Sequence, residues 1–355
     1  MNTTSTQITG IGSVTPYGPL AGLLNFESSE SSESLEPRVI TAWTTPGLRR
    51  AFLVEPFRPA AVVPGLKTRR LDRLSAWALV ASSLALQDAG VDLNQMDRSR
   101  IAVVFATSFG CVELTEAFYQ SAAANGWPAT DPITFPETLS NAPAAHVALF
   151  HQLQGPNLTI SSKSFAAESA LLQAASLLRH NQADLAVVIA GDTLTQPVYE
   201  WYEAAHLLAP ACFNEEPLAP STGFIPGEGV VATVLEPTGK RQARSYAALR
   251  GGHWASGGDA QSCIHQLLGG AAPLRTICAG NGAPCASSEL TCSARRVVGP
   301  EATILPQQPV AAGLADAGAL FHLLLALSRK SGSGEAIMLG TAGVSGFAAL
   351  HLELL

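Results

Sequence analysis

Charge is scarce in this sequence. Charged residues make up only 14% of the 355 positions, and the net charge is -7. Nucleic-acid and anionic-membrane binding need a basic surface, so this balance argues against both. Apolar residues make up 47% of the chain, which excludes disorder and indicates that a partner or long buried helices cover much apolar surface. We therefore expect a globular protein with a large interface.

The sequence also lacks the signals for secretion, membrane insertion and metal binding. Its start has no basic stretch followed by an apolar run, and no apolar run reaches the roughly 20 residues of a membrane span. The six cysteines form no CxxC pair, and the seven-residue spacing of Cys278, Cys285 and Cys292 does not suit zinc. We expect a cytoplasmic protein with no membrane span, no metal and no cofactor.

No GxGxxG turn follows the first expected strand, which argues against an ordinary dinucleotide-binding fold. Apolar spacing predicts a short strand at Gln7–Val14 and a helix at Leu71–Ala89 that ends at Gly90. A buried strand is expected next, at Arg100–Ala106. This alternation is typical of an α/β protein.

A weak internal duplication organises the chain. ESALLQAASLLRHNQADLAVVIAGDT begins at Glu168 and DAGALFHLLLALSRKSGSGEAIMLGTAG at Asp316, and both combine an Ala/Leu-rich helix, a polar turn and a buried strand. Both helices are too apolar on every face to be exposed. The repeat predicts two similar halves packed together, residues 1–220 and 221–355.

Six segments follow one another along the chain: ITGIGSVTPYG, RLDRLSAWALVASSLALQDAG, RIAVVFATSFG, PITFPETLSNAPAAHVALFHQLQGPNLTISS, ADLAVVIAGD and FIPGEGVVATVLEP. In this order they cover nearly the whole chain and resemble the β-ketoacyl synthases of the thiolase-like superfamily. The resemblance implies a five-layer α-β-α-β-α fold made of two similar halves, and an obligate dimer.

The residues that carry catalysis in that family are replaced here. Condensing members use a cysteine thiolate at the start of a buried helix, two histidines and a lysine. By resemblance these positions fall on Ser164, Ala279, Ala312 and, within a residue or two, Gln307. A serine hydroxyl attacks a thioester only beside a base, and a methyl group cannot carry a proton. The family's closing Gly-Phe-Gly-Gly turn is reduced to GVSG at residues 343–346.

Three functional hypotheses stay open. The first is a chain-length-factor-like subunit, inactive alone, that pairs with an active ketosynthase and meets an acyl carrier protein through that complex. The second is an acyltransferase or thioester hydrolase that uses Ser164 as nucleophile and a desolvated Lys163 as base, unless Lys163 points to solvent or to a carboxylate. The third is a structural or regulatory homodimer without an acyl ligand.

The first hypothesis predicts which side chains shape the acyl tunnel. By resemblance these are Phe109, Leu114 and Phe118, after the strand RIAVVFA, and Ile133, Thr134 and Phe135, before Pro136. A phenyl ring at Phe109 would limit the space for a growing chain, although these residues could equally form ordinary core. We assign His146, His151 and His322 to core or surface roles rather than catalysis.

Overall fold

The computed structural model describes residues 5–22, 37–41, 43, 49–209, 212, 223–256, 261, 264, 266–267, 276–278, 303–305, 320, 334–342 and 346–355. Ten strands in these ranges form one continuous run of a curled sheet, with a further short strand, β2 (Gly18–Ala21), paired to β1. No helix among the described residues is long and apolar enough to cross a membrane. The cytoplasmic location stays a prediction.

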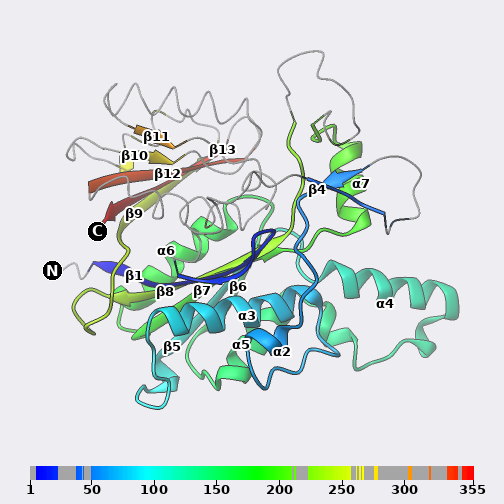
Figure 1. Cartoon of the computed structure of the whole chain (residues 1–355), viewed down its shortest axis with the longest axis horizontal. Helices are drawn as coiled ribbons and strands as arrows, with labels where there is room; N and C mark the ends of the chain where they lie inside the picture. Colours follow the sequence, from blue (N-terminus) through cyan, green and yellow to red (C-terminus); the bar gives the residue numbers. More distant parts are fainter. Residues whose placement is uncertain are drawn as a thin grey trace.

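The sheet contains the same five-strand pattern twice (Figure 1). The first set is β1 (Thr6–Thr15), β8 (Gly229–Pro237), β7 (Leu185–Asp192), β5 (Ile101–Thr107) and β6 (Asn157–Ser161). The second set is β9 (Ala247–Ser256), β13 (Gly346–Leu354), β12 (Gly334–Ala342), β10 (Thr276–Cys278) and β11 (Thr303–Leu305).

In each set the first two pairings are antiparallel and the last two are parallel. The duplication predicted from the sequence is therefore present in the strands, with β7 and β12 in equivalent places. The two sets join where three residues of β1 pair with β9. The strand β8 lies after residue 220 in the sequence but belongs to the first set of strands. The division of the chain after residue 220 therefore stays a proposal.

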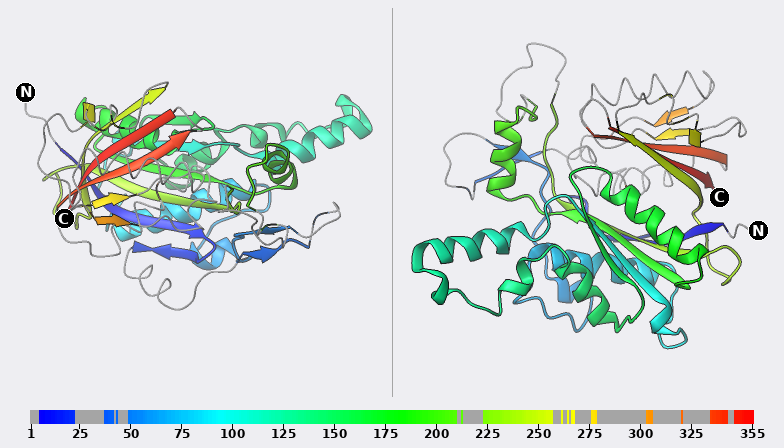
Figure 2. Two further views of the ribbon diagram at one scale, coloured as in Figure 1. Left: turned by 90° about the horizontal axis from the view of Figure 1, so that it is seen from above. Right: turned by 180° about the vertical axis from the view of Figure 1, so that it is seen from behind.

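Helices cover the first set of strands on both faces. On one side lie α3 (Arg73–Asp88) and α5 (Ala142–His151). The helix α3 can pack closely on β1 because Gly10 has no Cβ, which would otherwise meet the carbonyl oxygen of Ala85. On the other side lies α6 (Ala166–Arg179). Figure 2 shows the second set of strands on the far side of α6. The order is therefore helix, sheet, helix, sheet.

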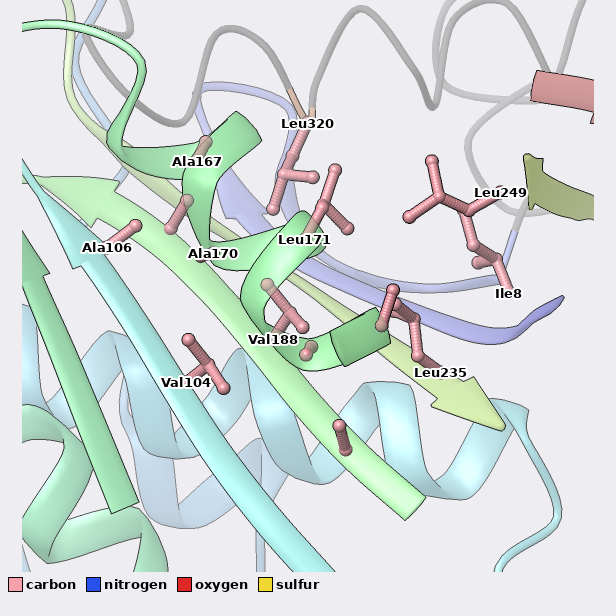
Figure 3. Close-up of a cluster of buried hydrophobic side chains, with 14 of the residues drawn as sticks. Ile8, Val104, Ala106, Ala167, Ala170, Leu171, Val188, Leu235, Leu249 and Leu320 are labelled. Carbon is pink, nitrogen blue, oxygen red and sulfur yellow. The ribbon is translucent and has the colours of Figure 1, made fainter. Parts of the chain in front are cut away.

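The helix α6 is buried between the two sets of strands (Figure 3). Ala170 and Leu171 pack with Val188 of β7 on one side and with Leu320 and Leu249 from the second half. Small side chains let the sheet approach the helix closely. The all-round apolar character read from the sequence is thus explained by burial on two sides.

The remaining described elements flank the sheet. They are β3 (Arg38–Val39), β4 (Arg50–Ala51), α2 (Pro59–Val62), α4 (Val112–Asn125), α7 (Gln196–Ala204) and the short 3-10 helices η1 (Arg98–Arg100), η2 (Trp127–Ala129) and η3 (Phe135–Thr138). The strands and helix expected at Gln7–Val14, Arg100–Ala106 and Leu71–Ala89 correspond to β1, β5 and α3.

Candidate functional site

Ser164 lies in the turn that joins the edge strand β6 to the buried helix α6. The next residue, Phe165, has a left-handed backbone (φ +59°), which costs a non-glycine residue energy. No side chain caps the start of α6 at Ala166, so its first N–H groups and the positive end of the helix dipole are open toward this turn. The start of α6 thus leaves N–H groups open beside the Ser164 alcohol, at the position where the resemblance predicts a nucleophile.

No base is bonded to the Ser164 hydroxyl among the described residues. The neighbouring Ser162 hydroxyl bonds the backbone of Ser164, donating to its carbonyl oxygen at 2.9 Å. The Lys163 ammonium donates to the backbone oxygen of Ser108 at 2.9 Å and lies 3.6 Å from the ring centroid of Phe109. Lys163 therefore points to the neighbouring turn, and this geometry does not favour its use as a general base for Ser164.

Phe109, which follows β5, is half-buried against aromatic side chains of the helix α7. Its ring centroid lies 6.0 Å from that of Trp201 and 5.8 Å from that of Tyr202, both in edge-to-face geometry. It packs on a small cluster that contains Leu194, Val198, Tyr199 and Tyr202. The sequence did not indicate this role for α7, because aromatic residues at helical spacing are usually ordinary core.

The other five predicted tunnel residues lie on one projecting segment, residues 112–139, which we call the arm. It consists of α4, η2 and η3, and Figures 1 and 2 show α4 extending away from the sheet. Phe118 packs on Phe135 and Trp127, with ring centroids 5.8 and 6.5 Å apart. Ile133 and Phe135 are 63% and 50% exposed, while Thr134 precedes η3 and donates to Asp131.

A buried polar network anchors the base of the arm. Asp72 caps α3 through the N–H of Leu74 and also accepts the N–H of Leu114 on α4. Burial raises the pKa of Asp72 to about 6. Arg73 donates to Glu228, just before β8, and to the carbonyl oxygen of Leu194. Leu114 is therefore fixed through its backbone to the body of the protein.

Glu168 is an unexpected feature of the first turn of α6. It is 2% exposed, and neither carboxylate oxygen has a hydrogen-bond partner in the described part of the chain. Burial raises the pKa of Glu168 to about 7. The sequence placed Glu168 in a buried helix without assigning it a role.

Several sequence assignments fall outside the described residues. These are Ala279, Gln307, Ala312, His322 and the turn at 343–345. The loss of catalytic groups at Ala279, Gln307 and Ala312 and the core or surface role of His322 therefore remain predictions from the sequence.

Of the three histidines that the sequence analysis assigned to core or surface roles, His146 and His151 lie within the described residues, and both have partners away from Ser164. His146 pairs with Glu137 of η3 at 2.7 Å. His151 lies against α3, 3.2 Å from the Ser83 hydroxyl, and burial lowers its pKa to about 4. Both contacts agree with core or surface roles.

Comparison with known proteins gives a consistent match. Residues 25–241 match the family model "Beta-ketoacyl synthase, N-terminal domain". The chain is 26% identical over 254 residues to 3-oxoacyl-[acyl-carrier-protein] synthase 2 of Coxiella burnetii, a match that covers 69% of this chain and 61% of the relative. The matched region thus spans about three-fifths of that relative's length.

Two solved structures share the fold over the whole chain. One is described as "The ishigamide ketosynthase/chain length factor", with a TM-score of 0.78, 22% identity and 99% coverage of both chains. The other is a type II polyketide acyl-carrier protein in complex with its ketosynthase bound to the hexaketide, with a TM-score of 0.79 and 17% identity, covering 99% of this chain and 100% of that one. The likeness confirms the expected thiolase-like α/β fold.

Proposed function

This chain belongs to the β-ketoacyl synthase family, and we propose that within it the chain is a non-condensing, chain-length-factor-like partner of an active ketosynthase. The pair would act in iterative polyketide, aryl-polyene or fatty-acid-type biosynthesis. The observation that carries the proposal is the Ser164 turn, which keeps the backbone of a nucleophile site while its alcohol has no bonded base among the described residues. The sequence replacements at Ala279, Ala312 and Gln307 point the same way.

An open sheet edge supports pairing with a second subunit. Among the described strands, β6 ends the sheet and pairs only with β5. Its sequence, NLTIS, carries none of the charges or prolines that usually protect an edge from another strand. We propose that the partner's edge strand pairs here.

The arm supports the same conclusion. Its exposed apolar side chains are Tyr119, Trp127, Ile133, Phe135 and Leu139, a larger group than an isolated subunit usually leaves in water. In the proposed complex the arm would lie against the partner and its aromatic residues would help to close the far end of the partner's acyl tunnel. We expect the interface to exceed about 2,000 Å², the obligate class.

An unpaired basic segment supports contact with an acyl carrier protein. Arg58, Lys67, Arg69 and Arg70 are exposed within 13 residues, and none of their side chains forms an ion pair or hydrogen bond in the described part of the chain. In a protein with a net charge of -7, such a local excess of positive charge favours an acidic partner. We propose that the carrier protein approaches the complex on this side.

The proposal is tested on Ser164. In a complex with a ketosynthase that retains its cysteine and two histidines, Ser164→Ala should leave turnover largely intact. Intact-mass measurement after incubation with an acyl carrier protein thioester should show no acyl group on this chain. Abolished turnover in Ser164→Ala, or an acyl adduct on Ser164, would instead support the acyltransferase or hydrolase hypothesis.

A further inference from the structure

The turn between β5 and α4, residues 108–110, is hydrogen-bonded to the buried carboxylate of Asp192. Asp192, at the end of β7, accepts the Phe109 N–H at 2.8 Å and the Ser108 N–H at 3.0 Å. It also accepts the Thr107 hydroxyl at 2.6 Å. Asp192 is 3% exposed, and hydrogen bonds to a buried charge are the strong ones. The backbone of Phe109 is therefore fixed.

Lys163 holds the same turn from the other side. Its ammonium bonds the Ser108 carbonyl oxygen, and it lies 3.6 Å from the centre of the Phe109 ring and 6.0 Å from that of Trp201. A cation at this distance from a ring is attracted by its π face. Lys163 thus contacts both the backbone of the turn and the side chain that the turn presents.

The ring of Phe109 is also enclosed laterally. Trp201 and Tyr202 of α7 meet it in edge-to-face geometry, and Tyr202 is in turn packed on Phe224, 5.0 Å away between ring centroids. With Lys163 over its face and α7 beside it, the ring has little freedom to change rotamer.

We propose that Lys163 and Asp192 form a clamp that holds the Phe109 ring in place and thereby fixes the acyl length at which this subunit stops a growing chain. Lys163 is a positioning residue that acts through Phe109. The length-setting step rests on the proposed function, whereas the clamp itself does not. The clamp also explains why Lys163, next to Ser164 in sequence, is not directed at its hydroxyl.

The first experiment follows the ring directly in the full chain. 4-Fluorophenylalanine is placed at position 109 and the ¹⁹F spectrum is recorded with Lys163, Lys163→Met and Lys163→Arg. We expect one sharp resonance with Lys163, a broadened or split resonance with Lys163→Met, and recovery with Lys163→Arg, whose guanidinium also binds ring faces. The control is Lys240→Met, since Lys240 pairs with Asp184 just before the start of β7, at the opposite end of that strand from Asp192. An unchanged spectrum in Lys163→Met would overturn the clamp.

The second experiment measures product lengths in the complex with the active ketosynthase. Lys163→Met should raise the ratio of over-extended to normal product about fivefold, the effect of losing a contact of about 1 kcal/mol, and Lys163→Arg should restore it. If Phe109→Ala lengthens the products but Lys163→Met does not, the length-setting role of the clamp is wrong. If Phe109→Ala itself changes nothing in an intact heterodimer, the tunnel role of Phe109 and the length-setting step both fail, while the ¹⁹F result still decides whether the clamp exists.

Discussion

Two aromatic groups of this chain have opposite surroundings. Phe109 packs against Lys163 and α7, above a turn whose Ser108 and Phe109 N–H groups are both bonded to Asp192. In the described part of the chain, the aromatic rings of the arm pair with one another, and Trp127 and Ile133 are 64% and 63% exposed. The first group is held in place by contacts within the chain. The second presents apolar surface that is favourable only when another subunit covers it.

The largest effect is expected when the arm is made unable to accept a partner. Ile133→Asp combined with Phe135→Asp places two carboxylates where the interface would bury them, and burying unpaired charge is costly. We expect at least about a 100-fold weaker complex, measured by analytical ultracentrifugation, with the melting temperature of the chain alone unchanged. Val39→Asp, at an exposed apolar site on β3, is the matched control. Normal assembly of the double variant would remove the arm from the interface.

The next effect concerns Glu168, the buried acid in the first turn of α6. Because the folded-state pKa of Glu168 is raised to about 7 from an ordinary value of 4.5, the folded chain holds a proton that the unfolded chain releases between these pH values. The stabilisation that comes from this protonation is therefore fully present below about pH 4.5. It falls by about 3 kcal/mol as the pH rises toward 7. Glu168→Gln removes this dependence. Urea unfolding at pH 5 and pH 8 should show a smaller loss for the variant than for the native chain, and parallel losses would contradict the assignment.

A smaller difference should separate Phe109 from Phe135 in stability. Phe109→Ala removes a ring from a packed cluster and should lower the free energy of unfolding by about 2 kcal/mol, whereas Phe135→Ala on the exposed arm should change it by less than about 0.5 kcal/mol. Denaturant titration of the isolated chain measures both. Equal losses would show that the arm is as well packed as the enclosed group.

The arm aromatics should matter for product length once the partner is present. Phe118→Ala in the complex should lengthen products without changing the chemistry, because a ring that closes the tunnel resists each added methylene by packing. Mass spectrometry of the products tests this. An unchanged distribution with the heterodimer intact would remove Phe118 from the tunnel.

The smallest effect is expected at the basic segment. Arg69→Glu with Arg70→Glu should reduce carrier-protein-dependent turnover by about three- to tenfold at low salt, and less as salt screens the charges. Stability should not change, since both side chains are exposed and unpaired within the described residues. A loss of turnover that is independent of salt would point to another cause.

The fold could be predicted from the sequence because its signals are local and repeated. The apolar runs of β1, β5 and β7 and the Ala/Leu pattern of α3 and α6 specify elements that are buried on both faces. The duplication indicated two similar halves, and a helix without a polar face, such as α6, was expected to pack centrally.

The site was less predictable because it depends on contacts between distant segments. The residue types at Ser164 and Phe109 could be assigned by resemblance, but the direction of Lys163 is set by Ser108, 55 positions away, and the clamp by Asp192 on another strand. An acid at the end of the otherwise apolar run LAVVIAGD was the one signal that could have indicated Asp192. Nothing in the local pattern marked Trp201 as a neighbour of Phe109.

The central claim is that this chain contributes no condensation chemistry. The most direct measurement uses the complex in which the partner's nucleophilic cysteine is replaced by alanine and this chain is left intact, supplied with malonyl and acyl carrier protein thioesters. We predict no carbon–carbon bond formation above background, and none by the isolated chain. Measurable condensation by either sample would contradict the account.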